Sequence, residues 1–258
     1  MSEKMPTLFI GHGSPMNAVE DNEFTQEWKD IANTIPKPQS ILCVSAHWYI
    51  PSIKVTAMEQ PRTIHDFYGF PPELYQHQYP AKGAPELAAL LSNTLNEYSI
   101  ELDQSWGLDH GTWSILKKMY PKADIPTIQL SIDYSKPPQF HFELGRKLDF
   151  LRDQGVLIIG SGNLVHNLGA VVWDSEDSVY EWAHQFEESI TDSIFNNNES
   201  LFVKFENIKD LAKKAHPTLD HYLPLLYAIG AGGLNDAPAV YNQKLIHGSV
   251  SMTCFKFG

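Results

Sequence analysis

The sequence predicts an α/β fold: a single domain, residues 1–258, with a central, mostly parallel sheet and helices on both faces. Three observations predict this fold. Short apolar runs alternate with longer amphipathic stretches. Several of these runs are apolar throughout, which is typical of strands that are buried on both faces. The chain has no internal repeat and no Ser/Gly-rich linker, so nothing marks a second domain.

The predicted strands are apolar or β-branched runs that end in glycine or polar residues. The first is TLFI, and the most uniform are SILCVS and VLIIG. In chain order the six predicted strands are Thr7–Ile10, Ser40–Ser45, Ile53–Met58, Ile125–Ile132, Val156–Gly160 and Gly248–Phe255.

The predicted helices carry apolar residues at spacings of three and four. Asn22–Ile35 places Phe24, Trp28 and Ile31 on one face, and Glu86–Tyr98 has a similar leucine stripe. Asn196–Ser200 (NNNES) is expected to be a surface turn between helices. The other predicted helices are Gly111–Tyr120, Phe140–Gln154, Val179–Phe195 and Leu219–Ala228.

Composition and charge exclude several classes of protein. With 43% hydrophobic residues and 19% charged residues, the chain is not a disordered protein. Its net charge of −12 argues against nucleic acid as a partner, since phosphate binding needs a basic face. No apolar run is long enough for a membrane helix, and the first residues do not have the layout of a signal peptide. Cys43 and Cys254 form no CxxC motif. We therefore expect a cytoplasmic protein without a membrane partner; the sequence predicts no oligomeric state.

Three of the eleven histidines each follow a predicted buried strand: His12 in GHGSP, His47 in SAHW and His166 in GNLVHN. Side chains at the carboxyl ends of neighbouring parallel strands meet at one edge of a sheet, where ligands bind. Imidazole is the commonest metal ligand among side chains. Each motif alone also fits an ordinary turn or a buried histidine, but the three together favour a shared metal site.

Two other segments supply histidines from loops. His110 in WGLDHGTW is expected in a turn that opens a helix. His216 and His221 bracket the turn of HPTLDH, and His221 is expected in the first turn of the next helix, where the helix dipole disfavours its protonation. His65, in an aromatic loop, could form a substrate wall or pack over the core. The remaining histidines are expected to be structural or surface residues: His77, His141, His184 and His247.

These segments together resemble a known family. GHGSPMNAVEDN, VSAHWYI, PRTIHDFYGFPPELY, WGLDHGTWSILKKMYP, IPTIQLSID, GSGNLVHNL and HPTLDHYLPLLYAIGA occur in this order from Met5 to Ala231. The chain resembles the DOPA 4,5-dioxygenase group of the class III (LigB-like) extradiol ring-cleaving dioxygenases. The resemblance implies an α/β oxidoreductase that cleaves a DOPA-like catechol with O2 at a mononuclear non-haem metal. Fe(II) is expected for activity, and zinc is plausible as the bound ion.

The resemblance also assigns roles to residues. It implies that His12, His47 and His221 are metal ligands, and that His166 is an acid/base beside the metal or a fourth ligand. His110 matches a histidine that contacts the substrate or supports the ligands.

The aromatic surroundings suggest a wall for the catechol ring. His65, Tyr68 and Trp48 are the candidate substrate-binding residues, with Phe67 beside them.

One departure concerns the third ligand. The wider class uses two histidines and a carboxylate, whereas this sequence offers His221, preceded by Asp220. An all-histidine site weakens the preference for Fe(II) and favours Zn²⁺. His216 remains an alternative third ligand.

Two other functions are compatible with the same histidines. A zinc-dependent hydrolase would use them with water as the fourth ligand, but the sequence contains no HExxH motif. A non-catalytic interaction protein of the same fold would be expected to have lost some of these histidines.

Overall fold

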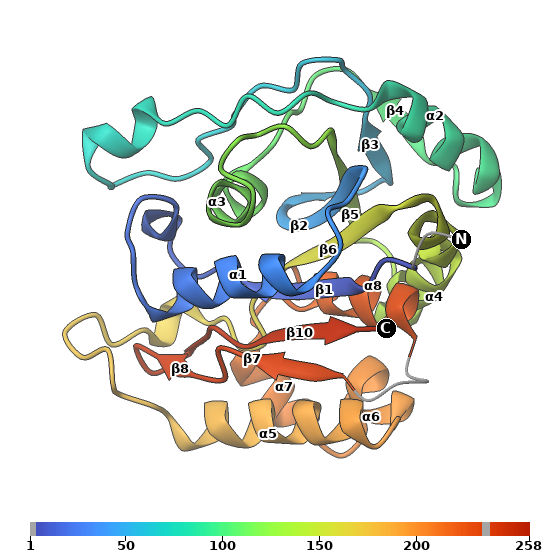
Figure 1. The fold of residues 1–258 in the computed structure, drawn as a ribbon. Coiled ribbons are helices and arrows are strands. Elements are labelled where there is room, and N and C mark those ends of the chain that lie inside the picture. The colour runs from blue at the N-terminus through green and yellow to red at the C-terminus, as the bar shows by residue number, and fades with distance from the viewer. Residues whose placement is uncertain (1–3, 234–237) are drawn as a thin grey trace.

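The computed structural model describes residues 4–233 and 238–258. Its centre is an eight-stranded sheet in the order β4-β3-β5-β2-β6-β1-β10-β7 (Figure 1). The strands of this sheet are β1 (Thr7–Gly11), β2 (Ser40–Ile50), β3 (Lys54–Thr56), β4 (Glu101–Asp103), β5 (Thr127–Asp133), β6 (Val156–Gly162), β7 (Ala239–Tyr241) and β10 (Cys254–Phe257). A separate small sheet pairs β8 (Leu245–Ile246) with β9 (Val250–Ser251).

The four central strands, β5, β2, β6 and β1, are parallel neighbours. Antiparallel strands flank them, because β3 runs against β5 and β10 against β1. The predicted α/β class with a mostly parallel sheet is therefore confirmed. The three strands that precede His12, His47 and His166 are adjacent, in the order β1, β6, β2.

Helices cover both faces of the sheet (Figure 1). One apolar core lies between the sheet and α1 and α3, and it contains Trp28 and Trp113. The other core lies on the opposite face against α4 and α8, with α5 to α7 packed beyond them. The helices are α1 (Glu23–Thr34), α2 (Pro85–Thr94), α3 (His110–Met119), α4 (Pro138–Lys147), α5 (Glu181–Phe195), α6 (Glu199–Lys204), α7 (Lys209–Ala215) and α8 (Leu223–Gly232). Short 3-10 helices are η1 (Pro15–Ala18), η2 (Pro72–Gln76), η3 (Asn96–Tyr98), η4 (Leu148–Gln154) and η5 (Leu168–Ala170).

Several predicted boundaries were wrong for local reasons. The run Gly248–Phe255 is not one strand, because it divides into β9 and β10. At this break the side chains of Ser251 and Thr253 both donate hydrogen bonds to the buried carboxylate of Glu187. Two of the predicted helices, Glu86–Tyr98 and Phe140–Gln154, each end early and continue as 3-10 turns. Short elements without a clear apolar period were missed: β4, β7, β8, α6 and α7.

Among the described residues, none of the helices has the length and apolar character that crossing a membrane requires.

Candidate metal centre

His12 lies at the end of β1, where the chain turns sharply. Its backbone N–H donates to the Gly162 carbonyl at 3.0 Å, which holds it beside β6. Gly13 has a φ of +58°, in the left-handed region that favours glycine. This turn leads into η1, whose N-cap is Ser14, and it leaves the His12 side chain buried at the sheet edge.

His47 lies inside β2 rather than after it, so the predicted end of this strand was wrong. The pairing of β2 with β5 loses its register between Val44 and Tyr49. A bulge of this kind re-aims side chains next to a functional site. His47 therefore points toward His12, and its Nε2 atom lies 3.1 Å from His12 Nε2.

His221 lies just before α8, which begins at Leu223, so its predicted place in the first helical turn was wrong. Its position is fixed by backbone contact with β6. The Asn163 N–H donates to the His221 carbonyl at 3.1 Å. Gly162 allows this approach, because a Cβ there would lie 2.1 Å from the His221 oxygen.

His110 and His166 complete the histidine cluster, by which we mean His12, His47, His110, His166 and His221. His110 is the first residue of α3, close to its predicted place, and its ring centroid lies 3.9 Å from that of His47. His166 follows β6, and its ring stacks on His221 with centroids 3.5 Å apart and an interplanar angle of 9°.

The ring nitrogens of His12, His47 and His221 all lie within 4.8 Å of one another, which is close enough for one ion. Two other groups of potential ligands adjoin this one and share members with it. One joins His47 and His110 to Asp66, and the other joins His166 and His221 to Asp220. At the carboxyl ends of the central strands, the imidazoles of His12, His47 and His221 therefore lie together, with the carboxylates of Asp66 and Asp220 next to them.

Hydrogen bonds select the imidazole tautomer at His12. The Ser161 hydroxyl donates its single proton to the Gly111 carbonyl at 2.5 Å. Ser161 Oγ can therefore only accept from His12 Nδ1, which lies 3.0 Å away. The proton is on Nδ1, and the lone pair of Nε2 is free for a metal.

Carboxylates fix the proton on Nδ1 in His221 and His110 as well. His221 Nδ1 donates to Asp220 Oδ2 at 2.5 Å, and His110 Nδ1 donates to Asp66 Oδ2 at 2.9 Å. The same Asp66 oxygen lies 3.5 Å from His47 Nδ1, while its other oxygen accepts the His110 backbone N–H at 2.9 Å. Asp66 thus accepts two hydrogen bonds from His110 and lies close to the ring of His47.

Burial keeps the central imidazoles neutral. It lowers the pKa of His12, His47 and His221 well below the usual value for histidine, and neighbouring histidines lower these pKa values further. Burial also lowers the pKa of His166, to about 4. Burial alone would raise the pKa of Asp66, but hydrogen bonds from His110 lower it to about 2.

These residues fit a divalent metal. Two nitrogens that each bind one ion at about 2.0–2.1 Å lie about 3.0–3.4 Å apart, and the His12–His47 separation of 3.1 Å falls in this range. Neutral imidazoles whose second nitrogen donates to an oxygen are the usual form of histidine ligands. Since the proton of His12 is on Nδ1, its Nε2 atom can only offer a lone pair, either to a metal or to a protonated His47 Nε2.

The structure does not bring His216 to the cluster. His216 is buried, and its Nε2 atom bonds the Leu164 carbonyl at 2.8 Å instead. Of the two histidines that the sequence left open as the third ligand, only His221 lies beside His12 and His47.

The three predicted substrate-binding residues also lie apart from the cluster's rings. Trp48 is buried and stacks on Trp106 at 5.4 Å, so it presents no free face, and Tyr68 is 92% exposed. His65 bonds the His77 carbonyl. Phe67 is the aromatic residue that approaches the cluster, with its ring edge against His110 at 5.6 Å.

Sequence reasoning missed Asp66 and Ser161, which hold the outer nitrogens of the cluster. The sequence did carry one signal for Asp66, since it directly follows His65 in TIHDFYGFP. Ser161 follows VLIIG at the end of a buried strand, the kind of position from which the histidines were found.

Comparison with known proteins agrees with this geometry. Residues 6–253 match a family model described as the catalytic LigB subunit of aromatic ring-opening dioxygenase. The chain is 46% identical over 260 residues to the 4,5-DOPA dioxygenase extradiol of Escherichia coli K12, covering 100% of this chain and 96% of that protein. It is 37% identical to the 4,5-DOPA dioxygenase extradiol of Beta vulgaris, covering 97% of this chain and 96% of that one. The crystal structure of an uncharacterized Escherichia coli K12 protein superposes with a TM-score of 0.86 at 42% identity, covering 99% of this chain and 100% of that one.

Proposed function

The chain belongs to the LigB family of aromatic ring-opening dioxygenases, and on this premise we propose that its histidine cluster holds the metal at which it cleaves a DOPA-like catechol. The enzyme is an extradiol ring-cleaving dioxygenase. The family uses one divalent metal, with a catechol and O2 as small-molecule partners. The site residues, the identity of the ion and the substrate are the parts that we propose.

The observation that carries this proposal is the convergence of His12, His47 and His221. We assign these three residues as the metal ligands. Three protein ligands leave open positions for the two oxygens of a catechol and for O2. We propose Fe(II) as the active ion, with Zn(II) able to occupy the same all-nitrogen site.

When bound, the ion supplies a redox-active Lewis acid at which the catechol and O2 meet. The remaining chemistry belongs to side chains. We assign His166 as the group that moves a proton at its ring nitrogen, because its ring lies flat against the ligand His221. His110, fixed through Nδ1 by Asp66, orients the substrate, and Phe67 packs beside it as an apolar wall.

The substrate proposal rests on the names of the relatives, which are 4,5-DOPA dioxygenases. Two alternatives from the sequence, a zinc hydrolase and a non-catalytic protein, gain no support from a family described by its catalytic subunit. A cytoplasmic location and the absence of nucleic-acid and membrane partners stay predictions.

The test is anaerobic loading with Fe(II), addition of DOPA and then admission of air. We expect oxygen uptake together with a new visible absorbance, and neither signal in His12→Ala. Uptake with another catechol but not with DOPA would overturn the substrate alone. No uptake with any of several catechols would overturn the proposed site chemistry.

A further inference from the structure

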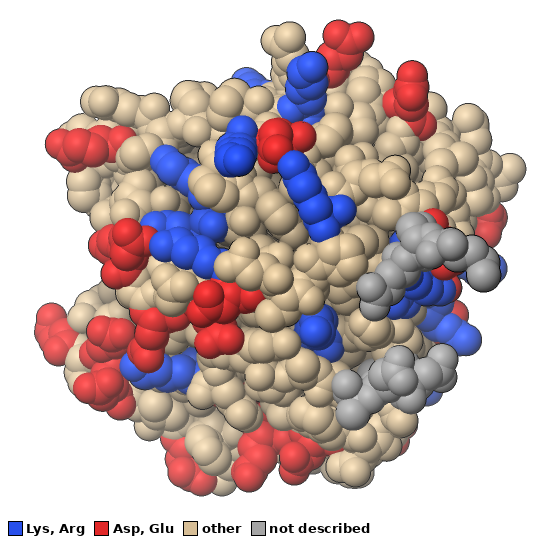
Figure 2. Space-filling view, viewed as in Figure 1, with Lys and Arg blue, Asp and Glu red and all other residues tan. Residues whose placement is uncertain are grey.

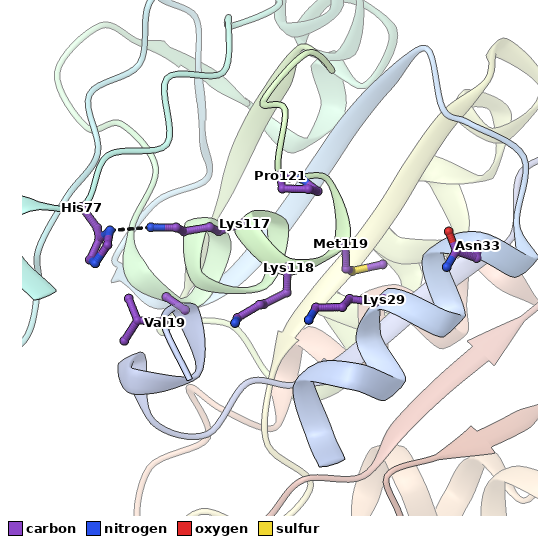
Figure 3. A pocket seen from close by; sticks show the side chains of 9 residues that line it. Val19, Lys29, Asn33, His77, Lys117, Lys118, Met119 and Pro121 are labelled. Carbon is purple, nitrogen blue, oxygen red and sulfur yellow. Dashed lines mark hydrogen bonds between the residues drawn. The ribbon is translucent and has the colours of Figure 1, made fainter. Parts of the chain in front are cut away.

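An open hollow lies on the surface between η1, α1 and the end of α3 (Figure 3). Its volume is about 540 Å³, and it shares no lining residue with the histidine cluster. We call it the basic pocket, because its polar wall is formed by Lys29, Lys117, Lys118 and His77. Val19 and Met119 are part of its apolar lining. The volume is in the range of small-molecule sites.

Two of these lysines share a single carboxylate. Lys118 is only 9% exposed, and its Nζ donates to Asp21 Oδ1 at 3.0 Å. Lys29 Nζ donates to the same oxygen at 2.8 Å, and Figure 3 shows the two lysines side by side between α3 and α1. Their hydrogen bonds lower the pKa of Asp21 to about 2. One negative charge therefore faces two positive charges.

Lys117 has a neutral partner instead of a carboxylate. Its Nζ donates to His77 Nδ1 at 2.5 Å (Figure 3). Within residues 4–233 and 238–258, none of the carboxylates lies within 4 Å of this ammonium. Burial and the charge of Lys118 lower the pKa of Lys117. Because His77 accepts at Nδ1, its own proton is on Nε2.

The pocket thus concentrates uncompensated positive charge in a chain whose net charge is −12. Basic side chains gather over α3 and α1 on this face, with acidic ones beside them (Figure 2). We propose that the basic pocket binds a small organic anion, in which a phosphate or carboxylate group meets lysines of the pocket and an apolar body lies against its apolar lining. Ammonium groups bind such oxyanions through charge-assisted hydrogen bonds.

The test is calorimetric titration of the metal-loaded enzyme with three probes: inorganic phosphate, phenyl phosphate and benzoate. We expect saturable binding of at least one organic probe, and weakening by about tenfold in Lys117→Gln. Tighter binding of phenyl phosphate than of benzoate would assign a phosphate ligand, and the reverse order a carboxylate. Lys213→Gln, an exposed lysine on α7, is the matched control and should bind as the wild type does.

A second variant tests the charge balance in the opposite direction. Asp21→Asn removes the carboxylate that competes for Lys29 and Lys118, so affinity for the same probe should rise several-fold. Asp21 is 76% exposed, so this variant is expected to fold even if a lysine variant does not. Oxyanions also bind metals, but binding at the histidine cluster would not respond to Lys117→Gln or Asp21→Asn. Affinities unchanged in both variants, or no saturable binding of any probe, would overturn the proposal.

Discussion

The histidine cluster and the basic pocket both gather nitrogen-bearing side chains, but in opposite chemical states. In the cluster, burial lowers the pKa of His12, His47 and His221 and keeps these rings neutral. Oxygens of Ser161, Asp66 and Asp220 hold the outer nitrogens of His12, His110 and His221. In the basic pocket the lysines carry protons, and a single carboxylate serves two of them. The first arrangement presents lone pairs and suits a cation, whereas the second presents protons and suits an anion. The difference teaches that the protonation state of the nitrogens, neutral in buried imidazoles and charged in ammonium groups, decides which kind of ligand a site can take.

The largest effect should follow from removing a nitrogen at the centre of the cluster. His12→Ala or His47→Ala should reduce bound metal from about one ion per chain to almost none, because two ligands hold a divalent ion poorly. Metal analysis after gel filtration measures this loss. His184→Ala, on the exposed side of α5, is the control. Full metal content in both cluster variants would mean that the ion is held elsewhere.

A smaller effect is expected where an imidazole lies beside the ligands without holding the metal. His166→Ala should lower kcat by about 10²- to 10⁴-fold, the usual contribution of an acid/base group, while metal content stays near that of the wild type. Metal analysis and steady-state kinetics on the same sample separate the two effects. A wild-type kcat would end the proton-transfer role, and loss of the ion would identify His166 as a ligand.

The outer partners of the cluster should contribute less than its rings. Asp66→Asn should lower kcat or metal affinity by about 10- to 100-fold, because the amide no longer fixes the Nδ1 proton of His110 and no longer places a negative charge 3.5 Å from His47 Nδ1. Asp66→Glu should restore part of the loss. Asp124→Asn, a surface carboxylate paired with Lys37, should change neither quantity. Equal losses in Asp66→Asn and Asp66→Glu would mean that Asp66 acts only as a packing residue.

The smallest expected effect concerns His141, a buried histidine outside the cluster, and it leaves ring cleavage at neutral pH unchanged. It shows what burial alone does to the pKa of a histidine that has no other histidine ring against it. His141 is fully buried, but its ring packs against Phe140 and Tyr227 instead of other imidazoles, with Nδ1 2.9 Å from the Tyr227 hydroxyl. Burial lowers its pKa from 6.5 to about 4. Below pH 6.5 the unfolded chain therefore takes up a proton that the folded chain does not, and the free energy of unfolding falls until about pH 4.

For this single histidine the loss between pH 7 and pH 5 should be about 2 kcal/mol. His141→Gln removes the titrating group, so its urea unfolding curves at the two pH values should lie closer together than those of the wild type. Identical pH dependence in the two proteins would show that other groups cause the acid sensitivity.

The sequence allowed the parallel centre of the fold to be predicted, because buried strands such as Val156–Gly162 are apolar enough to stand out from their neighbours. It also pointed to His12, His47 and His166 of the site, because each comes at or near the end of an apolar run in the sequence. The bulge that aims His47 could not be predicted, because it depends on pairing between β2 and β5. The pairing of Asp66 with His110 joins a loop to the first residue of α3, 44 residues further along the chain, and no local pattern encodes it.

The basic pocket was also beyond sequence reasoning. Lys117 and Lys118 resemble any solvated pair at the end of a helix, and only the packing of η1 and α1 brings Lys29 and Asp21 to them. His77 was expected to be a structural or surface residue, yet it is the acceptor for Lys117.

The position of β10 affects the order in which the protein can be assembled during its synthesis. β1, which carries His12 at its end, pairs on one side with β6 and on the other with β10, where Thr7 lies opposite Phe257. A nascent chain emerging from the ribosome therefore leaves one edge of its first strand bare until residues 254–257 are available. Contacts this distant in sequence form slowly, so we expect metal uptake to follow the synthesis of residues 254–257 rather than precede it.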